Sequence, residues 1–149
     1  MGRNDATELG YPSPPRMHWL LALILSIATA GVFAGLWALV IGAWLKRVRP
    51  QSSALALYLI FDVLGAALLV SILLPQRVHL VAWLPVFAVV VWIIASFVMR
   101  DDLMIHFNGD EPVGLSLGIW ATLFGSIYYF QSHLSNIARL KRELRESAG

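Results

Sequence analysis

Cysteine is absent from this chain of 149 residues, so disulfide bonds, thiolate catalysis and cysteine-ligated metal or iron–sulfur centres are excluded. Charge is also scarce, since charged residues make up 13% of the chain and apolar residues 58%. A soluble globule of this size needs more polar surface than that. The basic residues stand in short clusters at the edges of apolar segments and form no extended basic face, which argues against nucleic acid as a partner.

Catalytic signatures are missing as well. The chain contains no Ser-His-Asp spacing, no glycine-rich phosphate cradle and no His-Glu-x-x-His motif, so we predict that it is not an enzyme. The acidic residues between Arg100 and Pro112 lack the alternating spacing of a calcium loop, and no metal site is predicted.

Long apolar segments make up most of what is present. The first has no charge over 27 residues, about 40 Å of helix, and so predicts tilt, a bend near Gly31 or a first turn in the interface. Three more apolar segments follow, separated by short polar ones. The predicted spans are residues 19–45, 54–74, 78–99 and 113–131. The predicted fold is therefore all-α, an integral membrane four-helix bundle with short loops.

Polar segments flank this predicted transmembrane domain, which covers residues 18–131. Residues 1–17 are proline-rich and are predicted to be irregular, and the apolar run behind them is too long for a signal peptide. Residues 132–149 form a basic tail, predicted to be either an amphipathic helix on anionic lipid or a helical extension of the fourth span. Its basic residues are Arg139, Lys141, Arg142 and Arg145, of which Arg139 can pair with Glu143 and Arg142 with Glu146.

Four spans also define a topology. They place the N-terminus, the connection Pro75–Arg77 and the tail on one side of the membrane, and the loops at Lys46 and Arg100 on the other. The count of basic residues favours a multi-pass protein of the bacterial inner membrane with both termini in the cytoplasm, although the cluster from Lys46 to Arg49 argues for the reverse. The predicted interface anchors are Trp19, Trp44, Trp83, Tyr128 and Tyr129.

Two stripes of small residues are the strongest pattern in the chain. The first stripe consists of Gly31, Gly35, Ala38 and Gly42, and the second of Gly114, Gly118, Ala121 and Gly125. Small residues allow helices in lipid to approach closely, which is what drives their association. We predict that the two stripes pack against each other between the first and fourth helices, the alternative being a contact between chains.

Asp62 is the one charged residue inside the second span. A carboxylate there costs several kcal/mol unless it is paired, hydrated or protonated. Helix geometry places it level with Trp37, Trp92 and Thr122, so we predict a structural pin in which Asp62 accepts from an indole N–H or from the Thr122 hydroxyl. A proton or cation pathway and a contact with another subunit are the alternatives.

Histidines fall near one membrane face in the predicted topology, namely His18, His79 and His133. His79 or His133 could ligate a haem or a pigment through the imidazole. The alternative is that these residues are ordinary histidines at the membrane interface. Their spacing matches no specific motif, and no cofactor is predicted.

Two phrases carry a resemblance. Residues 26–33, Ser-Ile-Ala-Thr-Ala-Gly-Val-Phe, precede Trp37 and a basic exit, and residues 129–136 read Tyr-Phe-Gln-Ser-His-Leu-Ser-Asn. Both resemble a family of small uncharacterised bacterial inner-membrane proteins with a Ser-x-x-Thr-x-Gly-(Ile/Val)-(Tyr/Phe) first span and a Tyr-aromatic-Gln-x-His-x-x-Asn closing helix. The resemblance implies a multi-span membrane protein and no assigned activity.

The chain is thus expected to offer many contacts and little chemistry. We predict an accessory, scaffold or structural subunit of a larger bacterial membrane complex, or a homo-oligomer, with the lipid bilayer and other membrane subunits as partners. The alternatives are a small transporter or channel with Asp62 on its pathway, and a cofactor- or pigment-contacting subunit of an electron-transfer complex.

Overall fold

The computed structural model describes residues 12–73, 83–110 and 114–147, which form helices joined by turns and short extended segments. Five α-helices and one π-helical turn lie within this part of the chain. They are α1 (Trp19–Ala28), α2 (Val32–Val48), α3 (Ala54–Leu73), α4 (Leu84–Ile105), η2 (His106–Asp110) and α5 (Ile119–Ser147). The described residues contain no strand, so the predicted all-α class is confirmed.

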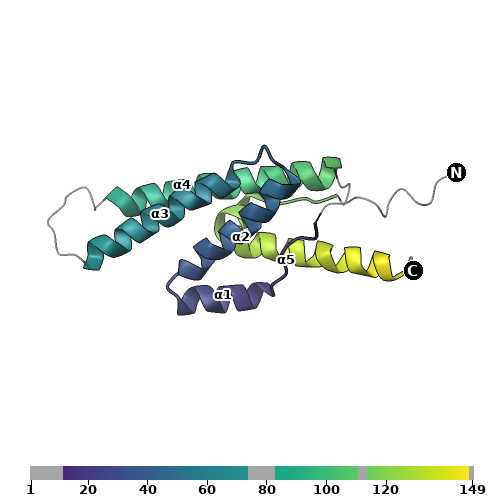
Figure 1. Cartoon of the computed structure of the whole chain (residues 1–149), viewed down its shortest axis with the longest axis horizontal. Helices are drawn as coiled ribbons and strands as arrows, with labels where there is room; N and C mark the ends of the chain where they lie inside the picture. The colour runs from purple at the N-terminus through teal and green to yellow at the C-terminus, as the bar shows by residue number, and fades with distance from the viewer. Residues whose placement is uncertain (1–11, 74–82, 111–113, 148–149) are drawn as a thin grey trace.

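The predicted first span, 19–45, is wrong as a single helix, because the chain turns back between α1 and α2. Ala30 and Gly31 both have positive φ, 50° and 91°. The N–H of Gly31 bonds to the Ser26 carbonyl at 2.7 Å and that of Ala30 to the Ile27 carbonyl at 3.2 Å, the pattern of a Schellman cap. The bend predicted near Gly31 is therefore a helix end, followed by a new helix that returns along the molecule (Figure 1).

The second and third predicted spans correspond to α3 and α4, which pack against each other along their length (Figure 1). Pro85 lies in the first turn of α4, where its missing N–H costs no hydrogen bond, and residues 78–82 lie outside the described part. The helix then runs beyond the predicted end at Met99. By length and composition, Ala54–Ile72 and Leu84–Asp110 can each cross a membrane.

The predicted fourth span, 113–131, is also wrong in its bounds. Residues 114–118 are extended, held by Asn108 Nδ2 on the Leu115 carbonyl and by Arg100 Nε on the Leu117 carbonyl, both at 2.9 Å. Helix α5 starts only at Ile119, bends at Ser126 (φ 38°, ψ −120°) and continues through the predicted tail. The predicted tail is therefore helical and continues the part of α5 that follows the kink.

The chain reversal in the first apolar segment changes where the loops lie. Trp44, near the end of α2, donates from Nε1 to the Pro12 carbonyl at 2.9 Å, and Arg49 forms an ion pair with Asp102 near the end of α4. Pro12, the ends of α2 and α4 and the C-terminal end of α5 thus share one end of the molecule (Figure 1). The prediction that the Lys46 loop lies opposite the N-terminal segment is wrong in this arrangement.

The core lies where α2, α3, α4 and α5 meet. Its largest fully buried side chains are Tyr58, Phe107, Phe130, Ile41, Leu45 and Met99. Towards the connection between α3 and α4, these two helices extend beyond the other elements (Figure 1).

Candidate functional site

Asp62 is the first feature of the candidate site. Its side chain lies on α3 directly against Gly35 of α2, where a Cβ on Gly35 would overlap Asp62 Oδ1. The residue is half-buried, and Asp62 Oδ2 is shielded without a hydrogen-bond partner among the described residues. A shielded oxygen without a donor is costly for the charged form of the carboxylate in an apolar setting.

The predicted donors to Asp62 are engaged elsewhere. Trp37 Nε1 donates to Gln131 Oε1 at 3.0 Å, and the Thr122 hydroxyl donates to the carbonyl of Gly118 at 2.9 Å. Trp92 packs its ring against Phe61, with centroids 4.7 Å apart. The predicted polar pin from Trp37 or Thr122 to Asp62 is therefore wrong, because each of these two donors is hydrogen-bonded to another residue.

The small-residue stripes have different partners from those predicted. Gly35, Ala38 and Gly42 are buried, and a Cβ on Gly42 would lie 3.2 Å from the Leu55 Cα of α3. The first stripe therefore packs against α3 and not against α5. Gly31, which has positive φ, belongs to the turn before this stripe.

The second stripe does not form on one helix. Gly114 (φ 73°) and Gly118 precede α5, and Ala121 is half-buried in its first turn. A Cβ on Gly125 would lie 2.9 Å from the Cβ of Tyr129 in the same helix, next to the kink. The predicted contact between the two stripes is wrong, since the second is divided between an extended segment and a bent helix.

A cluster of buried hydroxyl groups joins three helices. Ser96 Oγ of α4 lies 2.7 Å from Ser126 Oγ of α5 and 3.4 Å from the Tyr58 hydroxyl of α3, and it donates to the Trp92 carbonyl at 2.8 Å. Because the single Ser96 proton goes to Trp92, both Ser126 and Tyr58 are left to donate to Ser96. This cluster was not predicted from the sequence. The only signal for it there is that single serines occur within apolar spans.

Gln131 is the second buried polar residue that connects several elements. The sequence predicted only that it ends the fourth span. It is fully buried, accepts from Trp37 and directs Nε2 to the Met17 carbonyl at 2.8 Å, to Ser135 Oγ at 3.0 Å and to the Pro15 carbonyl at 3.3 Å. Ser135 Oγ also donates to the Met17 carbonyl at 3.1 Å. One amide therefore joins α2, α5 and the N-terminal segment.

The end shared by α2 and α4 is tied by charge and aromatic packing. Arg49 Nε lies 2.9 Å from Asp102 Oδ1, although the N–H direction is not that of a hydrogen bond. The ring of His106 is fully buried beside Trp44 and lies 3.3 Å from the Asp110 carboxylate. The Arg49–Asp102 ion pair and the contact between Trp44 and His106 hold the ends of α2 and α4 together.

The predicted interface aromatics divide into two groups. Trp19 and Trp83 are exposed, as an anchor in lipid requires. Trp44 is instead buried, stacks on Phe107 with centroids 6.1 Å apart, and donates its indole N–H to the Pro12 carbonyl. Tyr128 and Tyr129 are half-buried, and the Tyr129 hydroxyl accepts from the N–H of Gly118 at 3.2 Å.

The histidines have local roles in the described part of the chain. His18 caps α1 by accepting the N–H of Leu20 at 3.3 Å, and His133 packs edge-on against Tyr129 at 4.7 Å. Partial burial lowers the pKa of His133 below its usual value, so the neutral ring is favoured. His79 lies outside the described residues, within which no three metal-ligating side chains gather.

The basic residues of the tail lie along α5. Arg139 forms the predicted pair with Glu143 at 3.7 Å, whereas Arg142 and Glu146 do not come within ion-pair distance. Lys141 is half-buried, and the side chain of Arg145 lies outside the described part.

No family model matches the chain, and neither a curated protein nor a solved structure matches it. The resemblance to small bacterial inner-membrane proteins therefore stays a prediction. What the fold defines is an all-helical protein in which two helices are long and apolar enough to cross a membrane.

Proposed function

We propose that this chain is an integral protein of the bacterial inner membrane that acts by association, as an accessory or scaffold subunit of a larger complex or as a homo-oligomer. The observation that carries the proposal is the apolar outer surface of α3 and α4. Large side chains on both helices are exposed, including Val63 (66%), Ile72 (70%) and Phe87 (59%). A surface of this kind needs lipid or another apolar helix around it.

The shape of the molecule adds to the proposal. Helix α1 has 10 residues, about 15 Å, half the thickness of a bilayer core of about 30 Å. Its turn into α2 carries the exposed apolar side chains of Ile27 and Val32, and the Thr29 hydroxyl is bonded to the Leu25 carbonyl. A turn whose backbone and hydroxyl groups bond internally is suited to a hydrocarbon environment. We infer that α1 and α2 form a re-entrant hairpin beside the complete α3–α4 hairpin.

This arrangement implies an incomplete bundle. In the half of the bilayer that α1 does not reach, α3 and α4 are the only helices of the described part of the chain, and two helices cover little of each other's surface. A second copy or another subunit would fill that half, which is why association is the proposed role.

The distribution of charge supports a cytoplasmic position for the end that carries Pro12 and the C-terminal end of α5. The basic residues on the elements that meet there are Arg16, Lys46, Arg47, Arg49, Arg100, Arg139, Lys141 and Arg142. Under the positive-inside rule these residues all favour one orientation, whereas four alternating spans divided them between two sides.

Mild detergent extraction tests the proposed role. The protein should migrate as an oligomer, or together with other membrane proteins that mass spectrometry then identifies. A monodisperse monomer without co-purifying protein, from both its native membrane and an overexpressing strain, would refute the proposal.

A transporter or channel is the second candidate, and it is favoured by Asp62 Oδ2, which is shielded and has no hydrogen-bond partner in the described part of the chain. A carboxylate in a span marks an ion or proton pathway by default. Asp62→Asn keeps the side-chain volume and removes the charge, so it should abolish proton-coupled or cation flux in proteoliposomes while the fold is retained. If neither the native protein nor the variant conducts, this candidate fails.

A further inference from the structure

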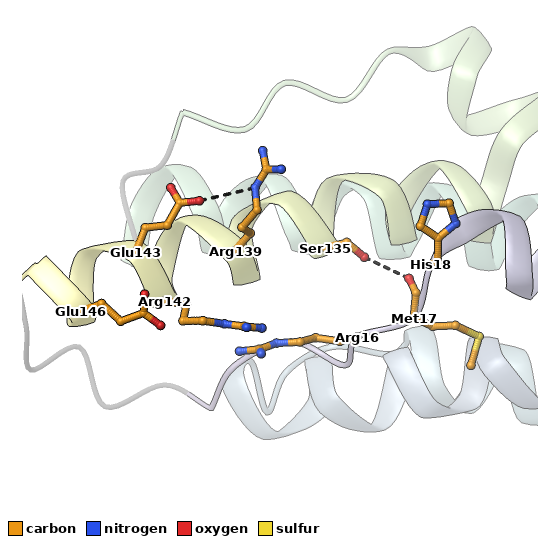
Figure 2. A pocket seen from close by; sticks show the side chains of 8 residues that line it. All are labelled: Arg16, Met17, His18, Ser135, Arg139, Arg142, Glu143 and Glu146. Atoms are coloured by element: carbon orange, nitrogen blue, oxygen red, sulfur yellow. Dashed lines mark hydrogen bonds and ion pairs between the residues drawn. The ribbon is translucent and has the colours of Figure 1, made fainter.

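A basic cavity lies between the N-terminal segment and α5 (Figure 2). Its volume is about 580 Å³, and its walls are Arg16, Met17 and His18 on one side and α5 from Ser135 to Glu146 on the other. The two walls are far apart in the sequence, so the cavity exists only because the N-terminal segment lies along α5.

Two arginines in this cavity, Arg16 and Arg142, have no acidic partner among the described residues. Figure 2 shows the side chains of Arg16 and Arg142 extending toward each other from opposite walls. No carboxylate of the described residues lies within 4.0 Å of either guanidinium group. Two facing cations without a counter-ion form a favourable position for an anion, and guanidinium groups match phosphate oxygens in geometry.

Hydrogen bonds fix the position of Arg16. Gln131 Nε2 contacts the carbonyls of Pro15 and Met17, the residues on either side of Arg16, at 3.3 and 2.8 Å. Ser135 Oγ donates to the Met17 carbonyl at 3.1 Å, so Ser135 holds the wall of the cavity in place. The backbone that carries Arg16 is therefore attached to the helix that carries Arg142 before any ligand binds.

The cavity also contains an arginine that is paired with a glutamate and a second glutamate whose charge would repel an anion. Arg139 is occupied by Glu143, at 3.7 Å. Glu146 also lines the cavity, four residues after Arg142, but does not form an ion pair with Arg142. The negative charge of Glu146 nevertheless repels an incoming anion. Removing the Glu146 charge should therefore strengthen anion binding.

The geometry points to a binding site for a phosphate group, held between Arg16 and Arg142. The group belongs either to the headgroup of an anionic phospholipid or to a soluble phosphate compound. Exposed Trp19 follows His18 directly and begins apolar α1, which puts the cavity at headgroup level if the proposed membrane embedding is correct. The lipid source rests on that embedding, and the soluble source does not.

Calorimetric titration of the full chain in a neutral detergent tests the site and distinguishes the two sources. The probes are short-chain phosphatidylglycerol, short-chain phosphatidylcholine and inorganic phosphate. Phosphatidylglycerol should bind at least ten-fold more tightly than phosphatidylcholine, and comparable binding of inorganic phosphate would identify a soluble ligand in place of a lipid.

Variants decide whether these two arginines form the site. Arg16→Gln with Arg142→Gln should weaken phosphate or phosphatidylglycerol binding at least ten-fold, and Glu146→Gln should strengthen it two- to five-fold. Arg47→Gln, an exposed arginine outside the cavity, is the matched control and should change affinity less than two-fold. The inference is overturned if neither probe binds the native protein, if the double variant binds like the native protein, or if Arg47→Gln causes an equal loss. Because none of these outcomes depends on oligomerisation, failure here is distinguishable from failure of the proposed role.

Discussion

The carboxylate of Asp62 lies in the space that a side chain on Gly35 would occupy. The two residues belong to α3 and α2, so the absence of a Cβ on one helix accommodates the polar group of the next. The small residues and the acidic residue of the second predicted span are two separate features in the sequence, but in the structure they form one contact between two helices. Stability and any ion chemistry at Asp62 therefore depend on the same position.

The first prediction follows from this contact. Gly35→Ala should destabilise the protein by about 1–3 kcal/mol, because the new methyl group and the carboxylate require the same space. In an Asp62→Ala background the same substitution should be nearly neutral, giving a coupling energy above about 1 kcal/mol.

Thermal or denaturant unfolding in detergent measures both effects. Gly65→Ala on α3 is the matched control, since a Cβ there meets nothing within 4 Å. Strictly additive free energies for Gly35→Ala and Asp62→Ala would show that the two side chains do not compete.

The Schellman cap between α1 and α2 carries the second prediction. Ala30 has φ 50° at the position where glycine is usual, so Ala30→Gly should stabilise the protein by about 1 kcal/mol. Gly31 has φ 91°, and Gly31→Ala should destabilise by a similar amount although a Cβ there meets nothing within 4 Å. Opposite signs for two adjacent substitutions, measured by unfolding, would identify backbone conformation as the cause. A destabilising Ala30→Gly would indicate that residues 19–45 form one continuous helix.

The length of an apolar segment predicted some helices of this fold correctly and others wrongly. The length of the apolar segment predicted α3 within one residue of its end, because one charged residue, Asp62, does not change the hydrophobic composition that decides whether such a segment forms a helix in an apolar setting. The same measure failed for residues 19–45, since it ignores φ. A glycine in a packing stripe and a glycine at a helix end look alike in the sequence, and Gly31 is the second kind.

The candidate site was predicted only in part. Asp62 was recognised from its type and position alone, but its neighbour Gly35 was assigned to a contact with the fourth helix. The partners of Trp37 and Ser96 lie 94 and 30 residues away, and such pairings depend on the kink at Ser126 and on the start of α5 at Ile119. Neither the kink nor the extended segment before it has a distinct signal in an apolar sequence.

The third prediction concerns the buried hydroxyl cluster. Ser96→Ala leaves the Tyr58 and Ser126 hydroxyls without their acceptor and should cost about 1–3 kcal/mol. Tyr58→Phe removes the long 3.4 Å contact with Ser96 and a smaller interaction with Ser126, and should cost less than about 1 kcal/mol. Adding Tyr58→Phe to Ser96→Ala should recover part of the loss, because the orphaned hydroxyl is then absent. A double variant that is less stable than Ser96→Ala alone would contradict the assignment of Ser96 as the common acceptor.

The last prediction concerns topology, and the absence of cysteine makes it directly measurable. Single cysteines at exposed Ser13, Gln51 and Asn136 should all react with a membrane-impermeant maleimide from the cytoplasmic side, because α1 and α2 form a hairpin that returns the chain to its starting side. A cysteine at Trp83, at the start of α4, should react only from the opposite side. Comparing intact right-side-out vesicles with inverted vesicles separates the two sides. Four alternating spans would instead place Gln51 on the side opposite Ser13, Trp83 and Asn136. Labelling of Gln51→Cys is therefore decisive, since reaction from the side opposite Ser13 and Asn136 would rule out the re-entrant hairpin and with it the single basic face on which the proposed orientation depends.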